Sequence, residues 1–210
     1  FSGDGSAAML GWCAGTALAG LALRSGPLSV AAVGIADAWL AMKLVGGFWL
    51  FSSGEIPHLF VVIAAGLFAV SYWTRSYAAR HLLVLSLIFY VVGLAVDDNL
   101  LVVAVLLALV SAAAFAAAVI APAATDAIAK LGGRLPLHGL IGFLTGMALV
   151  QFQLADTGGF AIAAAVTLAG IAAAIVLAGR QSRGLRWLAY LGFAFELCLI
   201  YAVTMETMLG

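Results

Sequence analysis

The chain has 210 residues, of which 66% are hydrophobic and 9% are charged, and its formal net charge is zero. A soluble domain carries about a quarter charged residues, so this chain lacks the residues for a polar shell around an apolar core. The composition therefore excludes an ordinary soluble globular domain, and without a basic patch nothing indicates nucleic-acid binding. It predicts an integral membrane protein with the lipid bilayer as its partner.

Eight apolar segments follow one another along the chain. A membrane-spanning helix needs about 20 mostly apolar residues, and each segment approaches this length. The predicted spans are 7–23, 28–51, 57–74, 82–96, 100–124, 135–154, 159–179 and 187–209. Pro122 lies late in the fifth span and should end or kink it. Because the loops are short, neighbouring spans should be antiparallel, so the predicted fold is all-α: one transmembrane helical bundle over residues 1–210 with up-and-down topology.

Basic residues indicate the orientation of these spans. Lys and Arg favour the cytoplasmic side of short loops, and here basic and acidic connections alternate at every crossing. All basic residues except Lys43 fall on one side of the membrane, namely Arg24, Arg75, Arg80, Lys130, Arg134, Arg180, Arg183 and Arg186. This pattern predicts that both ends lie on the outer side. Since Phe1 stands where a starting Met would be, we also expect a fragment of a longer chain.

Small residues predict close contacts between helices. Gly11–Gly15 in "GWCAG" and Gly142–Gly146 in "GFLTG" have the spacing that lets two helix backbones approach. These pairs serve either packing within the chain or dimerisation. Cys13 and Cys198 lie inside apolar runs, so we expect small buried hydrophobes and neither a disulfide nor a metal site. Trp39, in the middle of its span, is expected in the core.

Three stretches of the sequence carry a family resemblance. In residues 1–28, an aromatic residue and Ser-Gly-Asp precede an apolar span with an early Trp that ends at Arg-Ser-x-Pro. In "RGLRWLAYLGFAFELCLIYAVTMETML", Leu-Ala-Tyr is followed by a mid-helix Glu and a Tyr, and "GEIPHLFVVIAAGLFAVSYWTRS" fits in pattern. The chain resembles the 2157-type domain-of-unknown-function family of bacterial multi-pass membrane proteins. The resemblance implies a bacterial cytoplasmic (inner) membrane, extra spans before Phe1 and another helix after Gly210, but no activity and no site residues.

Five polar residues inside the predicted spans are the candidate site. Asp37 and Glu196 each lie nine residues into an outward-running span, which puts both roughly 13 Å deep. Lys43 is six residues beyond Asp37, about 120° around the helix, so either Asp37 or Glu196 is a candidate partner. Gln151 and Gln153 are further candidates to meet Lys43. Because a membrane-embedded charge costs about 2.5–3.5 kcal/mol, the charged residues should face the bundle interior or a wet cavity.

Three interpretations of this polar group stay open. The residues form structural polar contacts, or they line a path for an ion or small solute with a carboxylate that takes up a proton, or they face a partner subunit, a second copy or further spans. No zinc-protease, serine-hydrolase or phosphate-binding motif occurs in the sequence, which predicts no catalytic residue, metal or cofactor. The first hypothesis is a non-catalytic membrane protein with a structural or accessory role. The second is an ion- or proton-coupled small-solute transporter or channel, and a membrane-embedded enzyme is the remaining alternative.

Overall fold

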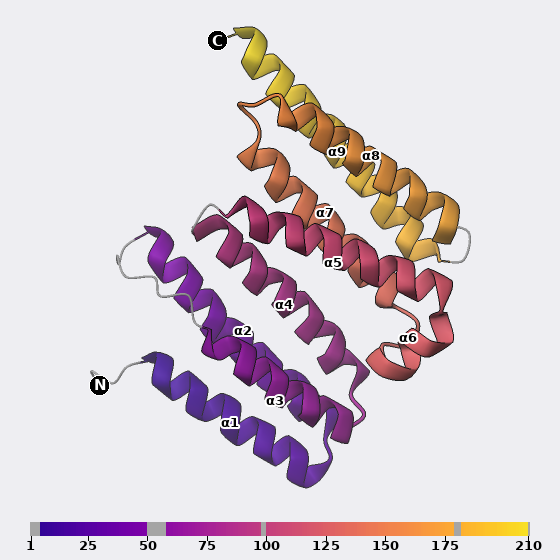
Figure 1. Cartoon of the computed structure of the whole chain (residues 1–210). Coiled ribbons are helices and arrows are strands. Elements are labelled where there is room, and N and C mark those ends of the chain that lie inside the picture. Colours follow the sequence, from indigo (N-terminus) through magenta and orange to yellow (C-terminus); the bar gives the residue numbers. More distant parts are fainter. Residues whose placement is uncertain (1–4, 50–57, 98–99, 179–181, 210) are drawn as a thin grey trace. The chain divides into compact units, whose positions relative to one another are not determined.

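A computed structural model describes residues 5–49, 58–97, 100–178 and 182–209, and in these ranges it contains nine helices and no strand (Figure 1). The helices are α1 (Gly5–Leu23), α2 (Gly26–Trp49), α3 (Leu59–Trp73), α4 (Tyr77–Asp97), α5 (Leu101–Ile120), α6 (Pro122–Ala129), α7 (Leu135–Gln153), α8 (Gly159–Ala178) and α9 (Arg183–Leu209). Each predicted span overlaps with one long helix, and the fifth also contains the start of α6. The all-α prediction is therefore confirmed for the described residues. The chain divides into two compact units, Phe1–Gly93 and Leu94–Gly210, which are described separately.

Six of the described helices are long and apolar enough to cross a membrane, namely α2, α4, α5, α7, α8 and α9. The apolar parts of α1 and α3, Ala7–Leu23 and Leu59–Trp73, are shorter. At 1.5 Å per residue, the 15 residues of α3 extend about 22 Å, whereas the hydrocarbon core is about 30 Å thick. The length criterion therefore supports six of the eight predicted spans. Residues 50–57, which hold the predicted end of the second span and start of the third, lie outside the described ranges.

The predicted fifth span, 100–124, is interrupted near its end by a short extra helix. α5 ends at Ile120, and Pro122 opens α6 at its first turn. A proline has no N–H to continue a helix but is accepted in the first turn of a new one. α6 ends at Ala129, its C-cap Lys130 has a positive φ of 48°, and Asp126 Oδ1 accepts a hydrogen bond from Gly133 N at 2.8 Å. The prediction that Pro122 ends the helix is thus confirmed, whereas the loop expected after it is partly helical.

Two similar turns connect helices in the first unit. In each turn an arginine with positive φ follows a helix, Arg24 (φ 48°) after α1 and Arg75 (φ 54°) after α3. The next residue is a serine whose hydroxyl accepts a backbone N–H of the following helix, at 3.5 Å for Ser25 and 3.3 Å for Ser76, as N-capping serines do. The Arg24 guanidinium lies 5.2 Å from the ring centroid of Trp73. This contact places the two turns together at one end of the first unit.

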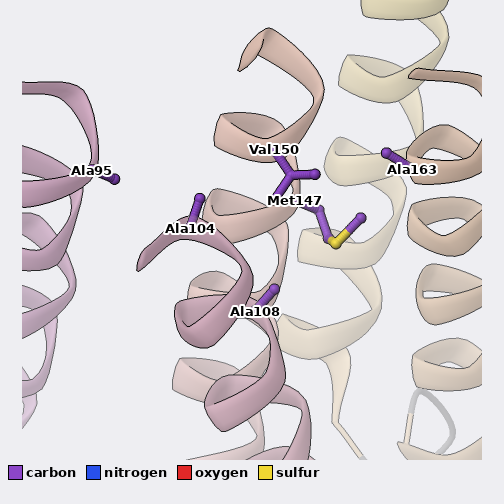
Figure 2. Close-up of a cluster of buried hydrophobic side chains, with 6 residues drawn as sticks. All are labelled: Ala95, Ala104, Ala108, Met147, Val150 and Ala163. Carbon is purple, nitrogen blue, oxygen red and sulfur yellow. The ribbon is translucent and has the colours of Figure 1, made fainter. Parts of the chain in front are cut away.

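α7 is the central helix of the second unit, and glycines let it approach α5. A Cβ added to Gly146 would meet the backbone N of Ala108 at 2.7 Å, and one added to Gly139 would meet the backbone N of Phe115 at 2.9 Å. Such distances leave no room for any side chain at these two positions. The adjoining hydrophobic cluster, shown in Figure 2, consists of Ala95, Ala104, Ala108, Met147, Val150 and Ala163.

The structure separates the two predicted glycine pairs and the two cysteines. Gly146 mediates packing within the chain, but a Cβ added to Gly11 or Gly15 would meet nothing within 4 Å. Cys13 is buried as predicted, whereas the prediction for Cys198 is wrong because its side chain is exposed on α9. An apolar helix with lipid on one side can leave a small hydrophobe exposed, so an apolar run alone did not decide the burial. Trp39, 3% exposed, lies in the core as expected.

Candidate functional site

A buried cluster of polar side chains joins three helices of the second unit. Gln151 comes from α7, Thr167 from α8 and Glu196 from α9, and their exposed fractions are 0%, 2% and 2%. Gln151 Nε2 donates hydrogen bonds to Thr167 Oγ1 at 2.8 Å and to Glu196 Oε2 at 3.1 Å. The predicted candidates Gln151 and Glu196 are thus brought together, and each helix of the cluster contributes one polar side chain.

The hydrogen bonds of this cluster leave two oxygens over. A primary amide has two donor hydrogens and a hydroxyl has one. Both hydrogens of Gln151 are used, and Thr167 donates its own to Ala163 O at 2.9 Å. Gln151 Oε1 and Glu196 Oε1 are buried and accept no hydrogen bond from the described residues. An unsatisfied buried polar atom destabilises the fold, so these two oxygens are the atoms of the cluster that can still accept a hydrogen bond.

Asp37 occupies a different setting in the first unit. Its carboxylate on α2 is half-buried and lies within hydrogen-bonding range of the Ser86 hydroxyl on α4. Ser86 Oγ also lies 2.7 Å from Leu82 O, so its single hydrogen serves one of the two acceptors. Asp37 Oδ1 is buried and accepts no hydrogen bond from the described residues. Asp37 of α2 therefore faces Ser86 of α4.

Lys43 and Gln153 lie outside both of these polar groups. Lys43 is exposed, and it has no hydrogen bond or ion pair within the described residues. Gln153 Nε2 donates to the backbone carbonyl of Ala95 at 3.2 Å, while Gln153 Oε1 is buried and has no hydrogen-bond partner in the part of the chain that the structure describes. The predicted contact of Lys43 with Asp37 is therefore not among the hydrogen bonds and ion pairs of the described residues. Gln151, Gln153 and Glu196 belong to the second unit, so their contact with Lys43 stays a prediction.

Thr167 and Ser86 are the members of these polar groups that sequence analysis missed. Thr167 is the one side chain of α8 that carries a hydroxyl, in an otherwise aliphatic, aromatic and glycine sequence. Ser86 stands among Leu, Ile and Phe in α4. A single hydroxyl inside a predicted span could have indicated each of these residues, because such groups form hydrogen bonds across helices.

Arg80 is a buried base in the first unit. It is 2% exposed, although sequence analysis grouped it with the bases of the loops. Its guanidinium lies 5.0 Å from the Tyr72 ring centroid and 4.6 Å from that of Tyr77, and its Nε donates to Ser76 O at 3.3 Å. Aromatic faces attract a guanidinium by cation–π interaction. Arg80 thus stabilises the start of α4 against the end of α3.

The apolar groove of the first unit contains none of the candidate polar residues. It has a volume of about 600 Å³ and lies between α1 and α3, with Leu10, Leu18, Ile63 and Leu67 in its lining. Within the described ranges, no group of three or more His, Cys, Asp and Glu side chains is placed to hold a metal ion. No family model, curated protein or solved structure matches the chain.

Proposed function

We propose that the chain is a multi-pass integral membrane protein. The observation that supports this proposal is the apolar character of the exposed helix surfaces. Large hydrophobic residues are exposed along the helices, including Leu109 on α5 at 61%, Val176 on α8 at 73% and Leu191 on α9 at 64%. In water such a surface would aggregate, whereas acyl chains solvate it at no cost.

The proposed topology has eight spans with both chain ends on the outer side of a bacterial cytoplasmic membrane. The alternation of basic and acidic connections supports it, as do Trp73 and Trp187, which are both 58% exposed near the basic end of their helices, where membrane proteins concentrate aromatic residues. The shorter helices α1 and α3 fit this topology if the bilayer thins locally, which costs fractions of a kcal/mol per Å. The sequence resemblance to the 2157-type family is a second support for the membrane location.

The proposed role is structural or accessory and not catalytic, with other membrane subunits or a second copy as candidate partners. Polar groups that join helices inside a bilayer stabilise a bundle by about 1 kcal/mol each. The contacts of Gln151 with α8 and α9 have this character.

A second candidate function is ion- or proton-coupled transport of a small solute. One observation favours it: Glu196 is an ionisable residue that is 2% exposed and has one oxygen without a partner. Ionisable groups at such positions often serve ion pathways. Flux measurements in proteoliposomes with Glu196→Gln and Asp37→Asn distinguish the two roles, with Glu206→Gln as an exposed control. Loss of flux in Glu196→Gln alone supports transport, and equal flux in all variants supports the structural role.

The topology can be tested with two single cysteines on either side of α7. In a C13S and C198S background, Ala127→Cys lies in exposed α6 and Asp156→Cys in the exposed α7–α8 connection. A membrane-impermeant maleimide added to intact cells should label Asp156→Cys and leave Ala127→Cys unlabelled until the cells are opened. Labelling of Ala127→Cys in intact cells would contradict the proposed topology.

A further inference from the structure

The two unpartnered oxygens of the Glu196 cluster belong to groups already in contact. Gln151 Nε2 and Glu196 Oε2 are 3.1 Å apart. Each group then has one oxygen left, its Oε1, which is buried and receives no hydrogen bond from the described residues. A carboxylate and an amide oxygen are both acceptors, so neither can satisfy the other. What this pair lacks is one donor hydrogen.

We propose that Glu196 and Gln151 form a proton-binding site in which the proton is held on Glu196 Oε1 and donated to Gln151 Oε1. The O–H bond forms when a proton from the aqueous phase adds to the carboxylate, and the neutral acid has the one donor that the pair lacks. The acid and the amide then exchange two hydrogen bonds, Nε2–H to Oε2 and O–H to Oε1. One proton therefore satisfies both leftover oxygens.

The described surroundings of Glu196 supply no charge that would replace this proton. α8 contains no ionisable residue, and neither does α5. α7 contains His138 alone, whose Nδ1 is 2.9 Å from Arg134 O near the opposite end of the helix. On α9 itself the nearest ionisable side chains are Cys198, which is exposed, and Tyr190 and Tyr201, also exposed. An isolated charged carboxylate in such a setting would be far more costly than the neutral acid.

Thr167 fixes the orientation of the Gln151 side-chain amide. Its hydroxyl accepts one hydrogen of Gln151 and donates to Ala163 O, which fixes the amide with Nε2 toward α8 and α9. This arrangement keeps Gln151 Oε1 available as the acceptor. Thr167 is thus a positioning residue for the proton site.

Infrared spectroscopy of the purified protein at neutral pH tests the site. The wild type should show a protonated-carboxyl stretching band that is lost in Glu196→Gln and retained in the matched control Glu206→Gln. In Gln151→Leu the band should move to higher frequency because the acid loses its hydrogen-bond acceptor. Circular dichroism confirms that each variant is helical. If Glu196→Gln does not fold, the band shift in Gln151→Leu carries the test.

A second readout separates a proton from other occupants. Raising the pH should remove the proton and lower the thermal unfolding temperature of the wild type, whereas Glu196→Gln, which keeps an amide in place of the acid, should lack this component. A Glu196-dependent carboxylate band at neutral pH would overturn the proposal, whether a water or a bound cation satisfies the oxygens. If sodium chloride raises the unfolding temperature of the wild type more than choline chloride does, and Glu196→Gln loses this difference, the site binds sodium and not a proton.

The inference depends on the proposed membrane setting, but the two fail in different ways. The infrared band is measured on folded protein in detergent and does not depend on topology. If the cysteine labelling contradicts the topology while the band is present, the proton site stands without the proposed function. If the labelling agrees and the band is absent, the membrane assignment stands and the site is wrong.

Discussion

The two units hold their helices together in different ways. In the second unit, Gly146 brings the α7 backbone against α5, and Gln151 on the same helix bonds to α8 and α9. In the first unit, a Cβ added to Gly11 or Gly15 of α1 would meet nothing within 4 Å, and the Arg24–Trp73 contact joins the paired turns. Helices in lipid associate by close packing and polar contacts more than by apolar burial. The second unit has both kinds of contact inside its core, whereas in the first unit a cation–π contact joins the two turns at one end.

The largest expected effect tests the close packing of α7. Gly146→Leu should destabilise the protein by about 3 kcal/mol, because a side chain there must push α5 away. Gly15→Leu, the matched change on α1, should leave stability unchanged or slightly raised, since leucine favours a helix more than glycine does. Unfolding in sodium dodecyl sulfate, followed by circular dichroism in mild detergent, measures both. Equal destabilisation by the two variants would remove the distinction between the units.

A smaller effect is expected at the two glutamines of α7. Gln151→Leu should cost about 2 kcal/mol because Glu196 Oε2 loses its donor while staying buried. Gln153→Leu removes one hydrogen bond to Ala95 O and should cost about 1 kcal/mol. The same unfolding assay ranks the two variants. If Gln153→Leu proves the more harmful, the Glu196 cluster is not the main polar contact of the second unit.

The smallest effect concerns the turns of the first unit. Ser76→Ala should cost about 1 kcal/mol, because it removes both the cap of α4 and a 3.4 Å hydrogen bond to Gly26 O. Ser25→Ala removes a longer, 3.5 Å cap contact and should cost less. Thermal unfolding monitored by tryptophan fluorescence compares them, since Trp73 lies beside the turn. A larger loss in Ser25→Ala would reverse the roles of the two turns.

Much of the fold could be predicted because long apolar segments in a chain with few charges are typical of long helices. Apolar length located the helices, and the chemistry of Pro122 located the end of α5. Helix α6 escaped prediction because its eight residues are too few to give a periodic signal. Residue spacing predicts a similar depth for Asp37 and Glu196, but spacing along one helix does not determine which neighbour a side chain meets.

The candidate site could be predicted only in part for the same reason. Gln151 and Glu196 lie 45 residues apart, and only the packing of α7 with α9 brings them together. The sequence suggested Lys43 as a partner because opposite charges attract, yet the amide of Gln151 is the observed partner of Glu196. Thr167 was missed because a single hydroxyl contributes little to any composition or charge pattern.

The central claim is that acyl chains surround these helices, and extraction from cell membranes tests it most directly. After expression, membranes are washed with alkaline carbonate and then with urea, and the protein is followed by immunoblotting. It should stay in the membrane pellet through both washes and leave it only with detergent. Release into the carbonate supernatant as a compact monomer that stays in solution without detergent would contradict the account.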